Sequence, residues 1–179
     1  MKRPANIALL CGAAAVILSC IIMLNLLKND TTMEILTGTY GGKIYMYSFD
    51  TESLEFTLLE KVGAENASYA IKDAGNIYAV SETGDASGAY SFSVGSQTAT
   101  TADKRQTGAD PCFIMKYDDR ILTADYSGGS VTVFPLIEGS LGDSIQKLDF
   151  QGNGPVEGRQ ESSHIHQLKT IPMTDWVLA

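Results

Sequence analysis

The sequence ILTGTYGGKIYMY, residues 35–47, sets the reading of the whole chain because it recurs as ILTADYSGGSVTVF at residues 121–134. A weaker copy lies between them, at residues 77–92. Successive copies are offset by roughly 43 residues, the length expected of a four-stranded propeller blade. A unit of this size cannot bury its own apolar face. The repeat therefore predicts similar β-units stacked around a common core.

Each copy has the pattern of two strands joined by a tight turn. Gly41-Gly42 and Gly128-Gly129 lie where a hairpin requires positive φ, which glycine adopts without steric cost. Tyr90, Phe92 and Val94 alternate with serines, as in a strand with two different faces. Helix-favouring runs are scarce after the first 30 residues. We expect an all-β fold, a partial β-propeller of about three four-stranded blades.

A fourth copy begins at Trp176-Val177-Leu178-Ala179, which matches residues 121–124, and the sequence ends there. Unclosed, such a fold would present an unpaired edge strand. We therefore expect a propeller that is incomplete at its C-terminus: a fragment, a truncated gene product, or a chain whose sheet is completed by another chain.

The N-terminal segment Ala5–Leu27 contains no charged residue and, at about 23 residues, is long enough to span a bilayer as a helix. Lys2 and Arg3 precede it, which places the remainder outside the cytoplasm by the positive-inside rule. Residues 17–20 resemble a loose bacterial lipobox with Cys20 as the lipidated residue. The two interpretations, uncleaved anchor or signal segment of a lipoprotein, give the same topology. We expect residues 1–33 to be an anchor and linker, and residues 34–179 to be a membrane-tethered, extracytoplasmic (periplasmic-side) propeller of a bacterium.

Charge and cysteine content exclude several classes of function. The formal net charge of −8 argues against a nucleic-acid partner. Cys112 is the one cysteine outside the apolar segment, so a disulfide framework and Cys/His metal spacing are excluded. It is best interpreted as a small buried apolar residue, since a nucleophile would need a base partner. We expect neither a metal nor a cofactor.

The chain has two histidines, His164 and His166. Their spacing on a strand would put both side chains on one face, and the repeat places His166 where Ser68 and Cys112 stand in earlier copies, at the start of the strand nearest the axis. Imidazole changes protonation near pH 7 and suits a general base. Two other interpretations stay open: a zinc pair, for which no third ligand is marked, or a purely structural pair.

Three further residues have competing interpretations. Arg159 could bind a phosphate or carboxylate bidentately, or it could be a solvated arginine in the polar, glycine-rich segment 151–163. Asp110 and Asp125 fall near strand ends beside the glycine turns, where carboxylates more often stabilise turns than act in catalysis.

The sequence resembles the lactonase-type seven-bladed β-propellers, a family that includes the propeller form of 6-phosphogluconolactonase. The resemblance covers about residues 35–179, the first three blades or so of the fold. It rests on motifs in the family's order and spacing: LTGTY at 36–40, AENASY at 64–69, GADPC at 108–112, ADYSGGSV at 124–131, GNGP at 152–155 and RQESSHIH at 159–166.

The resemblance implies hydrolysis of a sugar lactone to the aldonic acid, without a cofactor, in the central channel. It assigns His164 and His166 as catalytic candidates and Arg159 as a substrate-binding candidate. Ser163 stands where the family usually has proline before the first histidine, and the family's later arginine and glutamate residues would lie beyond residue 179. The alternatives are a non-catalytic sugar- or peptide-binding propeller and an inactive truncated remnant. We expect this chain alone to open lactones no faster than buffer.

Overall fold

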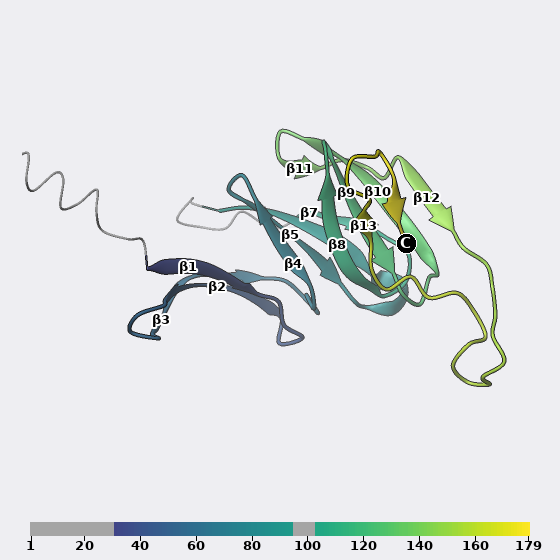
Figure 1. The fold of residues 1–179 in the computed structure, drawn as a ribbon, viewed down its shortest axis with the longest axis horizontal. Helices are drawn as coiled ribbons and strands as arrows, with labels where there is room; N and C mark the ends of the chain where they lie inside the picture. Colours follow the sequence, from purple (N-terminus) through teal and green to yellow (C-terminus); the bar gives the residue numbers. More distant parts are fainter. Residues whose placement is uncertain (1–30, 95–102) are drawn as a thin grey trace, which may run out of the picture.

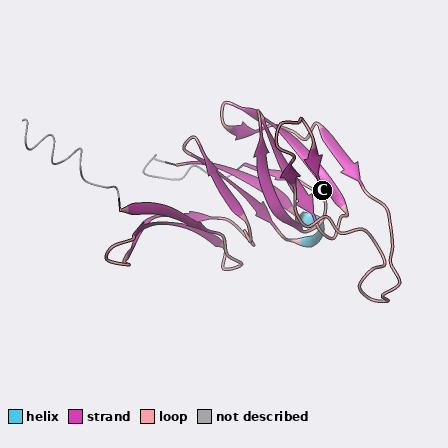
Figure 2. Ribbon diagram, viewed as in Figure 1, coloured by secondary structure: helices cyan, strands magenta, loops and turns pink. Residues whose placement is uncertain are grey.

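The computed structural model describes residues 31–94 and 103–179, and their regular secondary structure is almost entirely β-strand (Figure 1, Figure 2). The apolar segment Ala5–Leu27 and Cys20 lie outside the described residues, so the anchor and lipoprotein interpretations stay predictions. Within the two described ranges, no helix has the length and apolar character needed to cross a bilayer.

The first sheet has three antiparallel strands in the order β1 (Thr32–Thr37), β2 (Lys43–Asp50) and β3 (Phe56–Gly63). The glycine turn between β1 and β2 forms as predicted, with Gly42 at φ 77°. The second sheet has four strands, β4 (Ala70–Asp73), β5 (Asn76–Ser81), β6 (Gly88–Ser93) and β7 (Asp103–Gln106), paired in chain order. A short 3-10 helix, Gly84–Ala86, connects β5 to β6.

The third sheet contains β8 (Pro111–Tyr117), β9 (Arg120–Asp125), β10 (Ser130–Ile137) and β12 (Gln146–Asp149), together with the two-residue strand β11 (Ser140–Leu141) that also pairs with β10. After a long loop, β13 (Lys169–Thr170) and β14 (Val177–Leu178) form a separate antiparallel pair. This pair lies where the sequence predicts that a fourth unit begins.

The prediction of about three four-stranded blades is confirmed in part. By the sequence repeat, β1 matches β5 and β9, the second strands of the other sheets, so the first sheet has no counterpart of β4 or β8 among the described residues. The third sheet gains β11 because the turn at Glu138-Gly139, with φ of 50° and 82°, folds the chain back on β10 before it continues to β12.

The sheets stack face to face, and a strand such as β5 directs alternate side chains toward the two neighbouring sheets. In β5, Ile77 packs with Ile44 of the first sheet, whereas Tyr78 packs with Ile114 and Phe134 of the third. All five side chains are essentially inaccessible to solvent. Each large apolar side chain buried in this way contributes about 1.5–3 kcal/mol to stability. The core is therefore a series of interfaces between neighbouring sheets, as a stacked repeat requires.

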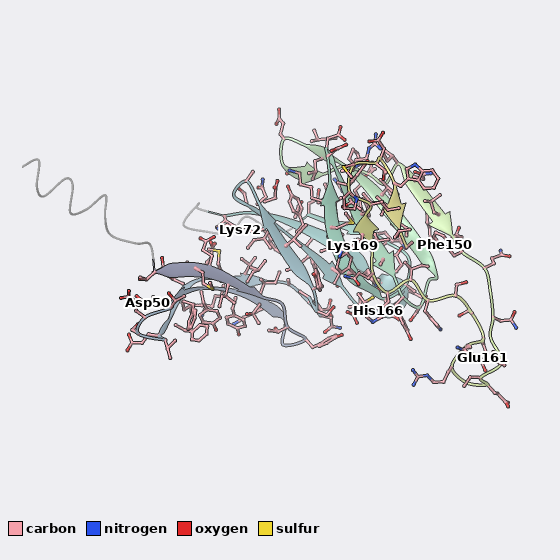
Figure 3. All side chains as sticks on the ribbon, in the orientation of Figure 1. Asp50, Lys72, Phe150, Glu161, His166 and Lys169 are labelled. Atoms are coloured by element: carbon pink, nitrogen blue, oxygen red, sulfur yellow. The ribbon has the colours of Figure 1, made fainter. Side chains whose placement is uncertain are left out.

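The sheets converge on the edge formed by their first strands. β4 contacts both β1 and β8, and Figure 1 shows the sheets side by side in chain order. Two lysines cross between neighbouring sheets at this edge. Lys72 of β4, labelled in Figure 3, pairs with Glu34 of β1, and Lys116 Nζ of β8 lies 2.5 Å from Asp73 Oδ2 of β4. We call this convergent edge the inner edge.

Candidate functional site

The two histidines lie on the segment that leads into β13, beside the end of β9. His164 stacks on the ring of Tyr126 with centroids 4.4 Å apart, and His166 meets the same ring edge-on at 5.8 Å. Tyr126 directly follows β9, and Ile165 between the histidines is buried in the interface with Leu122 and Ala124. Burial of Ile165 anchors the segment and leaves both imidazoles exposed to solvent.

One hydrogen bond defines the tautomer of neutral His164. Its Nδ1 lies 3.0 Å from the carbonyl oxygen of Tyr126. A carbonyl oxygen only accepts hydrogen bonds, so Nδ1 carries the proton. The lone pair of the neutral ring is then on Nε2. The contact thus assigns the proton of neutral His164 to Nδ1.

Cys112 connects the histidine segment to β8. Its Sγ lies 3.5 Å from the carbonyl oxygen of His166 and 3.8 Å from those of Ala124 and Ile165. Burial is the largest cause that raises the pKa of this thiol, and the charge of Glu82 is the second. The prediction of a small buried apolar residue holds in part: Cys112 is only half-buried, and its raised pKa disfavours the thiolate that a nucleophile would need.

A second polar cluster lies at the inner edge, between the first and second sheets. Tyr40 Oη donates to Glu82 Oε2 at 2.7 Å, and Ser68 Oγ donates to Glu82 Oε1. Glu82 directly follows β5, and Ser68 lies shortly before β4. The hydrogen bond from Tyr40 to Glu82 is the main cause that raises the pKa of the tyrosine hydroxyl. Sequence reasoning missed Tyr40 and Glu82 as candidate site residues.

The repeat relates the two clusters. One set of matching residues lies after the strands of ILTGTY, IYAVSE and ILTADY: Tyr40, Glu82 and Tyr126. A second set lies near the start of the strands that form the inner edge, as the sequence indicated: Ser68, Cys112 and His166. Ser68 contacts Glu82 within the second sheet, whereas His166 contacts Tyr126 across a sheet boundary. The signal that could have found Glu82 and Tyr126 was therefore present in the repeat.

A model of the family described as "Lactonase, 7-bladed beta-propeller" matches residues 34–179. The chain belongs to the seven-bladed lactonase family. It is 32% identical over 155 residues to the 6-phosphogluconolactonase of Bacillus subtilis (strain 168), an alignment that covers 79% of this chain and 44% of that protein. The resemblance predicted from sequence, to the N-terminal portion of these lactonases, is confirmed.

Solved structures agree. A proposed 6-phosphogluconolactonase from Bacteroides fragilis NCTC 9343 superposes with a TM-score of 0.75 at 33% identity, over 81% of this chain and 44% of that one. One from Bacteroides uniformis ATCC 8492 gives 0.75 at 29% identity, over 83% and 46%. The chain thus spans less than half the length of these relatives.

In this member of the lactonase family, the structure does not bring Arg159 to the histidines. Arg159 is exposed on the long loop between β12 and β13, and its side chain makes no hydrogen bond or ion pair with either histidine in the described part of the chain. Figure 3 labels Glu161, two residues further on, at the tip of this protruding loop, whereas His166 lies beside the sheets. The assignment of Arg159 as a substrate-binding residue stays a prediction.

The two aspartates have structural roles. Asp125 is fully buried, and its carboxylate accepts hydrogen bonds from the hydroxyls of Thr123, Ser130 and Thr132 and from the backbone N–H of Gly108. Burial raises the pKa of Asp125, against the effect of these four donors.

Asp110 has φ 50°, and its Oδ1 accepts from the Gly84 N–H at 2.7 Å, across the sheet boundary. Both carboxylates therefore stabilise loops near the glycine turns, as predicted.

No group of three metal-ligating side chains occurs within residues 31–94 and 103–179. A cavity of about 300 Å³ lies elsewhere, between the third sheet and β14, and is lined by Leu122, Val131, Val133 and Leu148 among others. It contains neither histidine. The candidate site is thus an open surface at the inner edge.

Proposed function

We propose that this chain contributes part of a site that hydrolyses a sugar lactone, with His164 as the general base. The observation that supports the proposal most directly is the hydrogen bond from His164 Nδ1 to the Tyr126 carbonyl, which leaves Nε2 as the basic nitrogen. Membership of the lactonase family supports the substrate class. His166 shares the contact with Tyr126 and is the second candidate.

In the proposed reaction, Nε2 of His164 removes a proton from water as the water oxygen attacks the carbonyl carbon of the lactone. The tetrahedral intermediate collapses by breaking the bond between that carbon and the ring oxygen. The imidazolium returns its proton to the ring oxygen, which becomes the hydroxyl of the open aldonic acid. The negative charge on the intermediate needs hydrogen-bond donors or a cation, and Arg159 is the candidate of this chain for binding an anionic group of the substrate.

A chimaera tests this function. Residues 34–179 would replace the matching portion of the Bacillus subtilis 6-phosphogluconolactonase, so that the remaining blades come from the relative. We expect the chimaera to hydrolyse 6-phosphogluconolactone, and His164→Ala to lower kcat about 100-fold or more because general base catalysis contributes factors of this size. Arg159→Ala should raise KM and leave kcat close to its original value. His164→Ala activity equal to that of the parent chimaera would refute the assignment.

A non-catalytic sugar-binding propeller is the second candidate. It is favoured by one observation: in the described part of the chain, no lysine or arginine side chain makes a hydrogen bond with His164 or His166. A chimaera that binds the lactone but shows no turnover would support this alternative.

We also propose that the apolar segment Ala5–Leu27 tethers the propeller to a bacterial membrane, on its extracytoplasmic side. The proposal rests on the uncharged segment and the two basic residues before it. Alkaline extraction of membranes should leave the chain in the pellet, and Cys20→Ser tests the lipoprotein alternative through loss of lipid labelling. Release of the chain by alkaline carbonate would contradict both.

A further inference from the structure

The cluster of Tyr40, Ser68 and Glu82 has features of a binding site that the proposed mechanism does not use. The Glu82 carboxylate is half-buried and accepts one hydrogen bond on each oxygen. A carboxylate oxygen can accept two, so each retains acceptor capacity. Ser68 Oγ also keeps its lone pairs for a ligand donor. The cluster therefore offers several acceptors at one place on the surface.

Tyr40 supplies a fixed aromatic plane beside these acceptors. Its side chain is 65% exposed, yet the hydroxyl at its tip is bonded to Glu82 on the neighbouring sheet. An exposed tyrosine normally samples several rotamers, and a ligand that needs one of them must order it. The bond to Glu82 orders the ring in advance. A rigid, amphipathic ring of this kind suits a flat ligand with one apolar face.

The cluster lies close to the histidines rather than at a remote place. Glu82 and Tyr126 occupy matching positions in consecutive sheets, and Tyr126 carries His164 on its ring. Cys112 lies between the clusters: its Sγ is 3.5 Å from the His166 carbonyl oxygen, and it is near enough for the charge of Glu82 to act on its thiol. A ligand engaged by Tyr40 and Glu82 could therefore extend toward His164.

The charges of the cluster select the ligand. Glu82 carries a carboxyl group, and in the part of the chain that the structure describes no lysine or arginine side chain makes a hydrogen bond or ion pair with the side chain of Tyr40, Ser68 or Glu82. A phosphate or carboxylate group would be repelled at this position, whereas hydroxyl groups would donate to Glu82. The chemistry fits an uncharged, polyhydroxylated ring.

We propose that Tyr40, Ser68 and Glu82 form a subsite that binds the hydroxyl-bearing ring of an uncharged sugar lactone, next to His164. This proposal rests on the proposed function, which places the ester group of the lactone at His164. It adds a preference for lactones that carry no phosphate group on the part bound by the subsite.

The test uses the full 179-residue chain in a mild detergent, with carbon-13 in the tyrosine rings. The probe is glucono-δ-lactam, whose ring amide resists the hydrolysis that opens the ester. Tyr40→Phe identifies the Tyr40 signals. We expect these signals to shift saturably with the lactam. The affinity should fall about tenfold or more for δ-valerolactam, because it lacks the hydroxyl groups that donate to Glu82. It should fall by a similar factor for the 6-phosphate of the lactam, because the phosphate is repelled by Glu82. A change of about 1.4 kcal/mol in polar contacts produces a tenfold change in affinity.

Two variants complete the test. Glu82→Gln keeps the shape of the side chain but replaces one acceptor oxygen by an NH2 group, so affinity for the lactam should fall about tenfold. Glu55→Gln makes the same change in the turn at the opposite end of the first sheet and should have no effect. Thermal melts of both variants show whether they fold as the parent does.

The outcomes separate the two proposals. Equal affinity for the three lactams, tighter binding of the phosphorylated one, or no effect of Glu82→Gln would overturn the subsite. An inactive chimaera alongside lactam binding that depends on Glu82 would overturn only the proposed hydrolysis. An active chimaera whose chain does not bind the lactam would overturn only the subsite.

Discussion

Tyr126 shows how a single residue can define the chemistry of another. Its carbonyl accepts the Nδ1 proton of His164, and its ring covers the face of the same imidazole. The orientation and the tautomer of His164 are thus determined together. Because the carbonyl belongs to the backbone, substitution of the Tyr126 side chain would leave the hydrogen-bond acceptor in place and remove only the stacking.

We predict that neutral His164 has its proton on Nδ1, whereas a free imidazole side chain favours Nε2. Nitrogen-15 chemical shifts of the full chain, measured above the pH at which the ring protonates, distinguish the two tautomers. Tyr126→Ala should keep the Nδ1 tautomer but broaden the ring signals as stacking is lost. An Nε2–H signal for His164 in the parent chain would contradict the assignment of this residue as the base.

Asp125 should make folding stability depend on pH. Burial raises its pKa in the folded state above the ordinary value, so between these values the folded state binds the extra proton. The free energy of unfolding contributed by this group is therefore highest below the ordinary carboxylate pKa and falls as pH rises through the folded value. Asp125→Asn should gain stability relative to the parent as pH rises above the ordinary aspartate pKa of about 3.9.

Urea denaturation over a series of pH values from about 4 upward measures the effect, with the exposed Asp118→Asn as the control. Parallel stabilities of parent and Asp125→Asn across the range would show that Asp125 does not titrate in this way. Asp125→Ala should cost about 2–4 kcal/mol at any pH, because it leaves a buried N–H and three hydroxyls without their acceptor.

At the scale of single residues, the sequence predicted the histidines but not their neighbours. Two histidines stand out in a chain that has no others, whereas Tyr126 and Glu82 look like ordinary residues after a strand. The repeat aligns Glu82 with Tyr126, but the contact that makes Glu82 a candidate comes from Tyr40 of the sheet before, across 42 residues of sequence. Contacts across sheet boundaries depend on how sheets stack, which local patterns do not encode.

The elements themselves repeat closely enough to provide matched controls. Gly42 and Gly129 hold the same place in the hairpins of the first and third sheets, and both have left-handed φ, 77° and 58°. A Cβ on Gly42 would meet nothing within 4 Å, whereas a Cβ on Gly129 would lie 2.7 Å from the carbonyl oxygen of Ser163. The pair differs mainly in that contact.

Gly42→Ala should therefore cost about 1 kcal/mol, the penalty of left-handed backbone for a residue with a Cβ. Gly129→Ala should cost about 1–3 kcal/mol more, because the segment next to His164 must move. Equilibrium denaturation measures both values, and the His164 ring signals report the displacement. If the two variants lower the free energy of unfolding equally, the loop before β13 shifts without energetic cost and does not hold His164 in place.

Strand counts were harder to predict than strand positions. The period of the repeat located β1, β5 and β9 correctly, but it does not reveal how many strands each sheet contains. Among the described residues, the first sheet has three strands because its first strand matches the second strand of the others. The strand β11 was missed because it has only two residues, too short for any alternation to appear.

For the whole molecule, the proposed site needs groups that the described residues do not bring to His164. Its imidazole is exposed, and an oxyanion that forms beside it would be stabilised mainly by water, where electrostatic effects are weak. We predict that the full chain, assayed alone by titration of released acid, opens 6-phosphogluconolactone no faster than buffer. An acceleration of about tenfold that His164→Ala with His166→Ala abolishes would contradict this prediction.

The lysine pairs at the inner edge have a consequence for assembly. Lys72 and Lys116 stand at similar places on β4 and β8, and each reaches back to an acidic residue on the preceding sheet. Such partly exposed pairs add little stability, but at these two interfaces they favour one orientation of the neighbouring sheet over the reverse. A sheet stacked in reverse would set lysine against lysine and acid against acid, and like charges in contact are unfavourable. If the sheets fold one after another, this repulsion disfavours an inverted sheet before its apolar face is buried.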